Sequence, residues 1–333
     1  MTLNGANVVV MKTASSYIIA EAGSNHDGKL SQAKQLIDIA AEAEADAVKF
    51  QLFRADTLYP NKNQPVHSVV KANELPREWL EELMDYSKSR SIDCLATPFD
   101  KEAISLLENV GVKAYKCGSS ETTNHKLLVQ LARTHKPVYL STGMCTMADI
   151  AEAVEILDAN GCPALTILHC YSLYPTAYED AHLRVMNTLR HAFQKPVGFS
   201  DHSLGIALPI AAAALGATVI EKHFTLDRNM KGPDHSYAIE PHELKEMVQQ
   251  IRNVEKSLGS SEKRLHPEEA AYGRRDGIYS KRPIKKGQVV TAEDLLIQRP
   301  ATAIAARYRL SVSGMTARSD LNEGSSINWQ DVE

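Results

Sequence analysis

The sequence lacks the features that define several large classes of protein. Its 333 residues contain no basic block, and a net charge of −4 gives no electrostatic reason to bind DNA, RNA or an anionic membrane. Its longest apolar stretches, such as Ile206 to Ala214, fall short of the roughly 20 residues that a membrane-spanning helix needs. The start, from Met1 to Ser16, carries no convincing signal peptide. We therefore expect a cytoplasmic protein with neither a nucleic-acid nor a membrane partner.

Cysteine is scarce, and the usual nucleotide-binding motifs are missing. The five cysteines are odd in number and include no C-x-x-C pair, and most lie in apolar runs: Cys94, Cys117, Cys145, Cys162 and Cys170. We interpret them as buried, reduced thiols. The sequence also has no G-x-G-x-x-G and no P-loop. With 44% hydrophobic and 23% charged residues, the composition excludes a mainly disordered, collagenous or coiled-coil protein.

What the chain does contain is a regular alternation of short apolar runs and longer helical patterns. The predicted strands begin near Tyr17, Ala47, Asp93, Ala114, Pro137, Leu165, Pro196 and Thr218. Helix starts fall between them, at Ser31, Pro76, Asp100, Thr146 and Pro241. Eight β-then-α units in about 240 residues predict an α/β fold, a (β/α)8 barrel. A doubly wound parallel sheet is the alternative.

The alternation of side chains along the predicted strands favours the barrel. Lys49 and Gln51 share one face of the second strand, and Glu21 opposes an apolar face in the first. In the last strand, Glu221 and His223 oppose Ile220 and Phe224. Polar residues thus gather on the inward face near the carboxyl ends of the strands, which is where barrel enzymes place their active sites.

The helical pattern ends after Leu258, and the rest of the chain differs in character. A polar stretch begins at Gly259, and the final sixty or so residues contain short β segments and turn residues. We predict a barrel domain over 1–258, a linker over 259–272 and a small, mainly β domain over 273–333.

Two histidines are predicted to lie at the tips of adjacent strands. His202 and His223 both point inward by strand alternation, and two converging imidazoles suit a divalent metal with open positions for substrate. The alternative is that each is a hydrogen-bonded structural histidine. Four other histidines are expected at the surface: His125, His135, His182 and His191.

Two inward lysines form the second candidate cluster. Lys49 and Lys116 end strands two and four, and an inward lysine is costly unless it meets an anion. Hydroxyls on other strand tips would complete a small cup for phosphate or carboxylate: Thr97, Ser119, Ser141 and Ser200. The alternatives are a lysine–glutamate pair inside the barrel, with Glu21 or Glu121 as the partner, and a Schiff-base lysine.

Other residues are placed near the same mouth by their position after strands. Glu21 and Glu121 are candidates for orienting hydroxyls or transferring protons, and Asp234 follows strand eight in a Gly-Pro-Asp turn. The segment from Arg54 to Leu75 is predicted to be an unusually long loop that forms a wall or lid.

The motifs together resemble the sialic acid (N-acetylneuraminate) synthase family. The resemblance covers residue 17 to the carboxyl terminus, and the tail resembles the family's SAF (antifreeze-like, β-clip) domain through Gln298-Arg299-Pro300. The barrel motifs are Ile19-Ala20-Glu21-Ala22-Gly23-Ser24-Asn25-His26-Asp27-Gly28, Val48-Lys49-Phe50-Gln51, Ala96-Thr97-Pro98-Phe99, Tyr115-Lys116-Cys117-Gly118-Ser119, Ser141-Thr142-Gly143-Met144, Tyr174-Pro175-Thr176, Ser200-Asp201-His202, Lys222-His223-Phe224-Thr225 and Gly232-Pro233-Asp234-His235.

The resemblance implies a metal-dependent transferase that condenses phosphoenolpyruvate with an N-acylated hexosamine and releases phosphate. N-acetylmannosamine is the first expectation for the sugar, with N-acetylneuraminate as the product. The implied metal, Mn²⁺ or Mg²⁺, is bound by His202 and His223. The implied phosphoenolpyruvate contacts are Lys49, Thr97, Lys116, Ser119, Ser141 and Ser200, and the implied catalytic groups are Glu21, Lys49, Lys116 and Asp234. The implied sugar contacts are Glu21, Gln51, Tyr171, Ser172, Tyr174, Asp234 and Arg299, the last from the partner of a domain-swapped homodimer.

The departures from the family pattern bear on the sugar. Tyr171 replaces a usual Thr and would reshape the sugar site if it faces inward, Ser120 precedes Glu121, and Ala301 follows Arg299-Pro300. Legionaminate and pseudaminate precursors, which are 2,4-diacetamido sugars, are therefore alternatives. More distant alternatives are an enzyme of the Kdo-8-phosphate type, against which the SAF-like tail argues, and a non-catalytic sugar-binding homologue.

Overall fold

The computed structural model describes residues 15–333, which form two compact units. The first unit ends at Gly259, and the second runs from Ser260 to Glu333. Most of the segment Met1 to Ser16 lies outside the described residues, so the structure does not bear on the expectation of a missing signal peptide. Across residues 15–333, the helices are too short or too polar to traverse a lipid bilayer.

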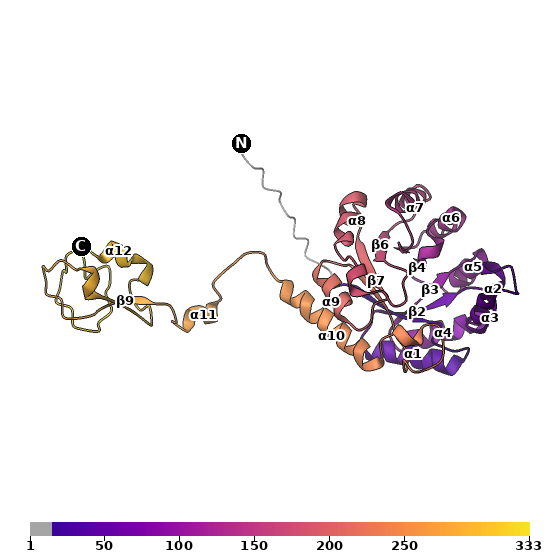
Figure 1. Cartoon of the computed structure of the whole chain (residues 1–333), viewed down its shortest axis with the longest axis horizontal. Coiled ribbons are helices and arrows are strands. Elements are labelled where there is room, and N and C mark those ends of the chain that lie inside the picture. Colours follow the sequence, from indigo (N-terminus) through magenta and orange to yellow (C-terminus); the bar gives the residue numbers. More distant parts are fainter. Residues whose placement is uncertain (1–14) are drawn as a thin grey trace. The chain divides into compact units, whose positions relative to one another are not determined.

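The first unit is a ring of eight parallel strands surrounded by helices (Figure 1). The strands run in the order β3-β2-β1-β8-β7-β6-β5-β4, and β3 and β4 lie side by side to complete the ring. Their bounds are β1 Tyr17–Gly23, β2 Ala47–Leu52, β3 Asp93–Pro98, β4 Tyr115–Cys117, β5 Val138–Ser141, β6 Leu165–Cys170, β7 Val197–Asp201 and β8 Val219–His223. The predicted barrel is confirmed, and each strand begins within one residue of its predicted start.

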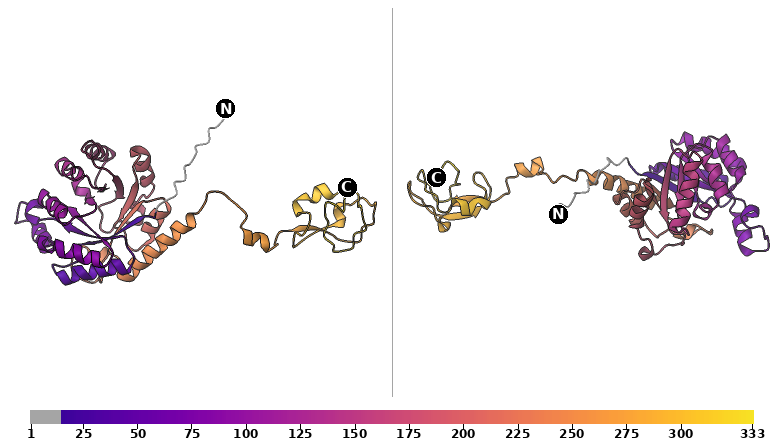
Figure 2. Two further views of the ribbon diagram at one scale, coloured as in Figure 1. Left: turned by 180° about the vertical axis from the view of Figure 1, so that it is seen from behind. Right: turned by 90° about the horizontal axis from the view of Figure 1, so that it is seen from above.

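One long helix follows each strand, and Figure 2 shows these helices around the ring. The buried apolar residues of the helices and strands form one core. These helices are α1 Leu30–Glu42, α4 Leu80–Ser89, α5 Lys101–Asn109, α6 His125–Ala132, α7 Met147–Ala159, α8 Val185–Phe193, α9 Ala207–Ala214 and α10 Pro241–Leu258. In α1, the buried residues recur at helical spacing: Ala33, Leu36, Ile37 and Ala40. The predicted caps are present, since Asp100 accepts a hydrogen bond from the backbone N–H of Ala103 and Thr146 forms a capping box with Asp149.

The prediction of a long loop between β2 and α4 is wrong in detail. The segment contains two short helices, α2 (Ala55–Leu58) and α3 (Pro65–Ala72). Pro65 occupies the first turn of α3, where a helix leaves the N–H groups unpaired, so its missing N–H costs nothing. Val66, Val69 and Val70 follow at helical spacing. The segment therefore presents a structured wall beside the carboxyl ends of the strands.

The second unit has its own small core and consists largely of turns and short strands. Strands β9 (Gly277–Ser280) and β10 (Leu295–Gln298) pair antiparallel, and isolated bridges such as Ile284 with Leu321 extend the β structure. Two short helices accompany them, α11 (Pro267–Ala271) and α12 (Arg309–Val312). The core comprises Ile278, Ile284, Val290, Leu295, Ile304, Val312, Ala317, Leu321, Ile327 and Val332. Helix α11 falls inside the stretch expected to be a linker.

The cysteines and surface histidines bear on two further expectations. All five thiols are free, but only Cys117 and Cys170 are buried, and the other three are partly exposed. The four histidines expected at the surface are all exposed.

Candidate active site

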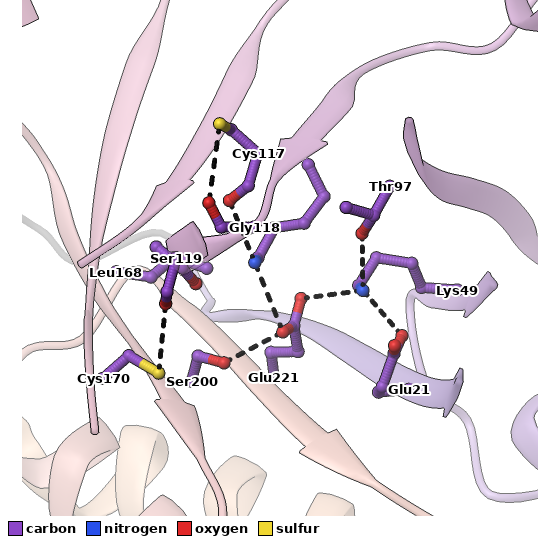
Figure 3. A network of polar contacts seen from close by, with 12 residues as sticks. Glu21, Lys49, Thr97, Cys117, Gly118, Ser119, Leu168, Cys170, Ser200 and Glu221 are labelled. Carbon is purple, nitrogen blue, oxygen red and sulfur yellow. Dashed lines mark hydrogen bonds and ion pairs between the residues drawn. The ribbon is translucent and has the colours of Figure 1, made fainter. Parts of the chain in front are cut away.

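The floor of the candidate site is a set of charged side chains that project inward from four strands. Glu21 and Lys49 are register partners on β1 and β2, and the Lys49 Nζ lies 2.7 Å from a Glu21 carboxylate oxygen. The Lys49 Nζ also donates to the Thr97 hydroxyl over 3.0 Å. Figure 3 shows Lys49 between Glu21 and Glu221, with Thr97 above it. The lysine–glutamate pair that the sequence left as an alternative is therefore present, with Glu21 as the partner of Lys49.

Glu221 is the member of this floor to which sequence reasoning gave no role. Its carboxylate lies 3.6 Å from the Nζ atoms of both Lys49 and Lys116, and it accepts a 2.9 Å hydrogen bond from the Ser200 hydroxyl. The signal was available in the sequence, because Glu221 shares the inward face of β8 with His223. Glu221, rather than Glu121, is the carboxylate beside Lys116.

The two carboxylates have opposite pKa shifts. Burial raises the pKa of Glu21 to about 7; the charge of Lys49 lowers this pKa, but the negative charge of Glu221 adds to the increase. Burial acts in the same direction on Glu221, but the positive charges of Lys116 and Lys49 outweigh it and lower the pKa to about 2. Burial opposes the charge of Lys49, yet Glu21 and Glu221 more than compensate and raise its pKa. Near neutral pH, Glu221 is thus an anion while Glu21 can gain or lose a proton.

The predicted phosphate and carboxylate cup surrounds a cavity of about 330 Å³ at the carboxyl ends of the strands. Its lining includes all the residues predicted to bind phosphoenolpyruvate: Lys49, Thr97, Lys116, Ser119, Ser141 and Ser200. The buried hydroxyl of Ser141 has no hydrogen-bond partner within the described chain, and a buried hydroxyl without a partner is unfavourable. The Ser119 hydroxyl accepts from the Gly143 backbone N–H over 2.9 Å. Ammonium and hydroxyl groups directed into one cavity can hold an anion with several oxygens.

The two histidines lie together at the edge of this cavity, with their ring centroids 5.3 Å apart. The Nδ1 of His202 lies 2.8 Å from the backbone carbonyl oxygen of Tyr171. A carbonyl only accepts, so Nδ1 carries the hydrogen and Nε2 keeps its lone pair. The Nδ1 of His223 is buried without a partner among residues 15–333. Burial lowers the pKa of each imidazole to about 4, with the charge of the other ring adding to the effect on His202.

These features fit a divalent cation bound by two neutral imidazoles, with the remaining coordination positions left to substrate and water. A second group of possible metal ligands lies at the start of α10, where ligand atoms of Glu240, His242 and Glu243 lie within 4.8 Å of one another. Both carboxylates of that trio pair with Arg228, and Glu240 and Glu243 form the capping box of α10. We interpret that trio as a helix cap.

The residues predicted to meet the sugar do not all lie in one place. Gln51, Ser172 and Tyr174 line the cavity, and the Gln51 amide donates to Glu21 over 2.9 Å. The Tyr174 ring lies 4.3 Å from the His202 ring, centroid to centroid. Tyr171 is different: Cys170, the last residue of β6, contacts His202 at the site, whereas the ring of Tyr171, the next residue, lies against His169.

The structure corrects the expectation that the Tyr171 ring faces the site. The ring packs edge-on against His169 and His182, in a neighbouring pocket. Its contribution to the site is the backbone carbonyl that orients His202. Arg299 lies in the second unit, where its side chain pairs with Asp276 over 2.9 Å. Its predicted contact with sugar stays a prediction.

Asp234 is held in place by the loops after β1 and β8. One carboxylate oxygen accepts from the Tyr237 hydroxyl over 2.7 Å, and the other accepts from the Ser24 backbone N–H over 3.2 Å. Gly23, at φ +51°, permits this approach, since a Cβ there would lie 2.8 Å from the Asp234 oxygen. Tyr237, which the sequence reasoning missed, is buried and also packs 5.3 Å from the His223 ring.

A second pocket, which we call the annex, adjoins the cavity and has a volume of about 440 Å³. Cavity and annex share four residues, Gln51, Phe99, Ser120 and Glu121. The annex wall is largely apolar and comes from the helical segment after β2: Phe53, Leu58, Tyr59, Val69 and Val70, with Asn73 as a polar group. Asp234 also lines the annex. A substrate in the cavity therefore has an apolar space beside it.

Comparison with known proteins places these features in one family. The NeuB family model matches residues 36–263, and the SAF domain model matches residues 275–333. The N,N'-diacetyllegionaminic acid synthase of Legionella pneumophila is 40% identical over 95% of this chain and 94% of its own. The human N-acetylneuraminate-9-phosphate synthase is 36% identical over 85% of this chain and 82% of its own.

Solved structures agree with the sequence comparisons. The crystal structure of the N-acetylneuraminic acid synthetase of Leptospira borgpetersenii, in complex with citrate, superposes with a TM-score of 0.73 at 35% identity. The match covers 78% of this chain and 90% of that one. The chain therefore belongs to the NeuB family of sialic and related acid synthases, with a SAF domain after its barrel.

Proposed function

We propose that this protein condenses phosphoenolpyruvate with the open-chain form of an N-acylated hexosamine, giving a nonulosonic acid and phosphate. The observation that carries the proposal is that three features adjoin one another in the cavity and the annex beside it. Two buried lysines and four hydroxyls provide an anion site, two neutral imidazoles provide a metal site, and the annex provides room for a sugar.

In this proposal, Lys49 and Lys116 bind the phosphate and carboxylate groups of phosphoenolpyruvate. Thr97, Ser119, Ser141 and Ser200 supply further hydrogen bonds. Both lysines already face Glu221 at 3.6 Å, so an incoming anion competes with that carboxylate for them. In the free enzyme, the contacts with Glu221 hold both lysines in orientation, so less reorganisation is needed when the substrate binds.

A divalent cation, Mn²⁺ or Mg²⁺, bound by His202 and His223 would polarise the sugar aldehyde as a Lewis acid. The sugar lies between this pair and the annex, where Tyr174 and Asp234 can contact it. C3 of phosphoenolpyruvate then forms a bond to the aldehyde carbon as the C=O π bond breaks; the aldehyde oxygen takes up a proton and becomes a hydroxyl, and positive charge develops at C2. Water adds at C2, and the resulting tetrahedral centre loses phosphate by cleavage of its C–O bond.

Glu21 is our candidate for the group that accepts the proton of this water. Its pKa of about 7 allows it to exist as a carboxylate at working pH and to hold a proton afterwards. Gln51 and Lys49 both contact the carboxylate and fix its direction. Asp234, held by Tyr237 and Ser24, is positioned to orient sugar hydroxyls.

The annex favours a sugar with a second acylamino group over N-acetylmannosamine. Sugar hydroxyls placed against valine, leucine and phenylalanine would lose hydrogen bonds to water, whereas acetyl and methyl groups would gain apolar contacts. No lysine or arginine occurs among the described residues that line the annex, which disfavours a phosphorylated sugar there. We therefore propose a 2,4-diacetamido hexose as the acceptor, and the 40% identical legionaminate synthase supports this choice.

The test is a comparison of kcat/KM for N-acetylmannosamine, its 6-phosphate and a 2,4-diacetamido-2,4,6-trideoxyhexose, with phosphoenolpyruvate and Mn²⁺. The diacetamido sugar should have the highest value. Val70→Asp places a charge in the annex wall at a partly exposed position, and it should raise the KM of this sugar more than about tenfold because the bound sugar would separate the unpaired charge from water. Val66→Asp is the matched control on the same helix, where Val66 is 38% exposed and outside the annex.

N-acetylmannosamine as the best substrate, with Val70→Asp without effect, would contradict the role of the annex and leave the condensation intact. Absence of phosphate release with all three sugars would contradict the proposed function itself. We also propose that the SAF domain acts on a partner's barrel in a homodimer, with Arg299 contacting the sugar.

A further inference from the structure

An ion pair lies buried on the helix-facing side of β7 and β8, behind the metal-site histidines. Asp201 and Lys222 are register partners on the two strands, and only 2% and 1% of their surfaces are exposed. The Lys222 Nζ lies 2.7 Å from an Asp201 carboxylate oxygen. The inward neighbours of the pair, Ser200 and Glu221, are also register partners and join the anion site. The pair therefore lies on the outer face of the strands, directly behind side chains of the anion site.

The pair holds the backbone of Ser203, the residue that follows His202, through hydrogen bonds. Asp201 accepts hydrogen bonds from the Ser203 backbone N–H over 2.9 Å and from the Ser203 hydroxyl over 3.0 Å. The Lys222 Nζ donates to the Ser203 carbonyl oxygen as well. Three polar groups of Ser203 are therefore held by a residue of β7 and a residue of β8.

Each histidine is a direct neighbour in the sequence of a residue of this network. His202 lies between Asp201 and Ser203, and His223 follows Lys222. The His202 carbonyl accepts from the Thr176 N–H over 3.1 Å, and the His223 carbonyl accepts from the Ile239 N–H over 3.0 Å. The pair is therefore a cross-strand tie between the two peptide segments that carry the imidazoles.

Stability alone does not account for a pair in this position. Burying two charges is expensive, and apolar residues of similar volume often stabilise a protein as well or better. The neighbouring outward positions Phe199 and Ile220 are apolar and buried, which shows that this layer accepts such residues. What apolar side chains cannot supply is a directional bond between the two strand tips together with three bonds to Ser203.

We propose that Asp201 and Lys222 are positioning residues that set the separation of His202 and His223 for a divalent cation. The proposal rests on the metal site of the proposed function. Outer groups that orient metal ligands typically change metal affinity by about 10- to 100-fold when they are replaced. Within residues 15–333, the side chains of the pair make no polar contact with the phosphoenolpyruvate cup, and Ser200 keeps its own hydrogen bond to Glu221, so loss of the pair should act on the metal more than on the anion site.

The experiment measures Mn²⁺ binding to the full-length protein by electron paramagnetic resonance of free Mn²⁺, with no substrate present. The main variant is Asp201→Leu/Lys222→Met, which removes both charges and retains apolar volume. The control is Asp46→Leu/Arg252→Met, a partly exposed 2.7 Å ion pair that also bonds to backbone groups of β1 and the residue before it. Binding of phosphoenolpyruvate by calorimetry is the second readout, and urea denaturation reports folding.

The main variant should fold, bind phosphoenolpyruvate within about threefold of wild type, and bind Mn²⁺ about 10- to 100-fold more weakly. The control should bind Mn²⁺ as wild type does, whatever its stability. If the main variant does not fold, Ser203→Ala, which removes only one hydrogen bond to Asp201, should still weaken Mn²⁺ binding at least threefold.

A folded main variant that binds Mn²⁺ within threefold of wild type would overturn the proposal, as would an equal loss in the control. For Ser203→Ala, unchanged Mn²⁺ binding would have the same meaning. Wild-type protein that does not bind Mn²⁺ would contradict the metal site itself and the role of the pair with it. The condensation can then be tested separately through phosphate release.

Discussion

Replacement of Glu221 by glutamine should destabilise the free protein, and phosphoenolpyruvate should compensate for the loss. The lysine charges lower the pKa of Glu221 from 4.5 to about 2, so the folded protein stabilises the carboxylate relative to its neutral form. At about 1.4 kcal/mol for each pKa unit, this corresponds to about 3 kcal/mol. A depressed pKa contributes stability that is fully present above pH 4.5 and is lost as the pH falls through the pKa of the folded state. The effect of replacing Glu221 is therefore measurable at pH 7.

Glutamine has nearly the shape of the neutral acid, so Glu221→Gln should lower the free energy of unfolding by about 3 kcal/mol at pH 7. Lys116 would then have no carboxylate within 4 Å among the residues that the structure describes, while Lys49 would keep Glu21. An incoming anion no longer competes with Glu221, so phosphoenolpyruvate should bind the variant more tightly and raise its stability more than that of wild type. Urea denaturation with and without phosphoenolpyruvate measures both effects.

The matched control is Asp158→Asn, whose partner Lys195 lies 2.8 Å away and whose side chain is 44% exposed. A surface pair of this kind contributes less than about 1 kcal/mol, and it should not respond to phosphoenolpyruvate. A Glu221→Gln variant as stable as the control, or one that phosphoenolpyruvate stabilises no more than wild type, would refute the argument that Glu221 is a substitute for the substrate anion.

Three further predictions concern pH, metal and the SAF domain. Burial lowers the pKa of His26, His202 and His223 from 6.5 to about 4, so the unfolded state binds more protons between these values and metal-free protein should lose stability as the pH falls through them. Glu21, with its pKa raised to about 7, has the opposite effect between pH 7 and 4.5, so the free energy of unfolding should be about 3 kcal/mol lower at pH 5 than at pH 7. Urea denaturation that shows equal or greater stability at pH 5 would count against these shifts. His202→Ala should abolish metal-dependent phosphate release, and release that persists unchanged after chelation of the wild type would argue against the metal site. Arg299→Ala should raise the KM for the sugar and leave that for phosphoenolpyruvate nearly unchanged, and steady-state kinetics with the reverse pattern would contradict its assigned role.

The architecture was largely predictable because a barrel repeats one simple pattern. Inward-facing polar residues at the strand ends are visible as a period of two, so Glu21, Lys49 and His223 could be placed at the barrel mouth from the amino-acid sequence alone. The capping residues Asp100 and Thr146 marked helix starts for a local physical reason, the unpaired N–H groups of a first turn.

The parts that could not be predicted depend on contacts between distant segments. The role of Glu221 follows from its distance to lysines on β2 and β4, which strand alternation alone does not give. Tyr237 follows a turn with no periodic pattern, and its bond to Asp234 depends on the path of the loop after β8. Helices α2 and α3 are short and lie in the segment that was predicted to be a loop. Helices of this length depend on tertiary contacts rather than on local propensity, so the sequence alone did not predict them.

The central claim is tested most directly by following phosphate release in ¹⁸O-labelled water with phosphoenolpyruvate, Mn²⁺ and a diacetamido sugar. Water that adds at C2 leaves its oxygen in the sugar acid, so phosphate should be released in a 1:1 ratio with that acid and should contain no ¹⁸O. Phosphate that carries ¹⁸O would show attack of water at phosphorus, and phosphate released at the same rate without sugar would show that its release does not depend on the sugar. Either result would contradict the proposed condensation.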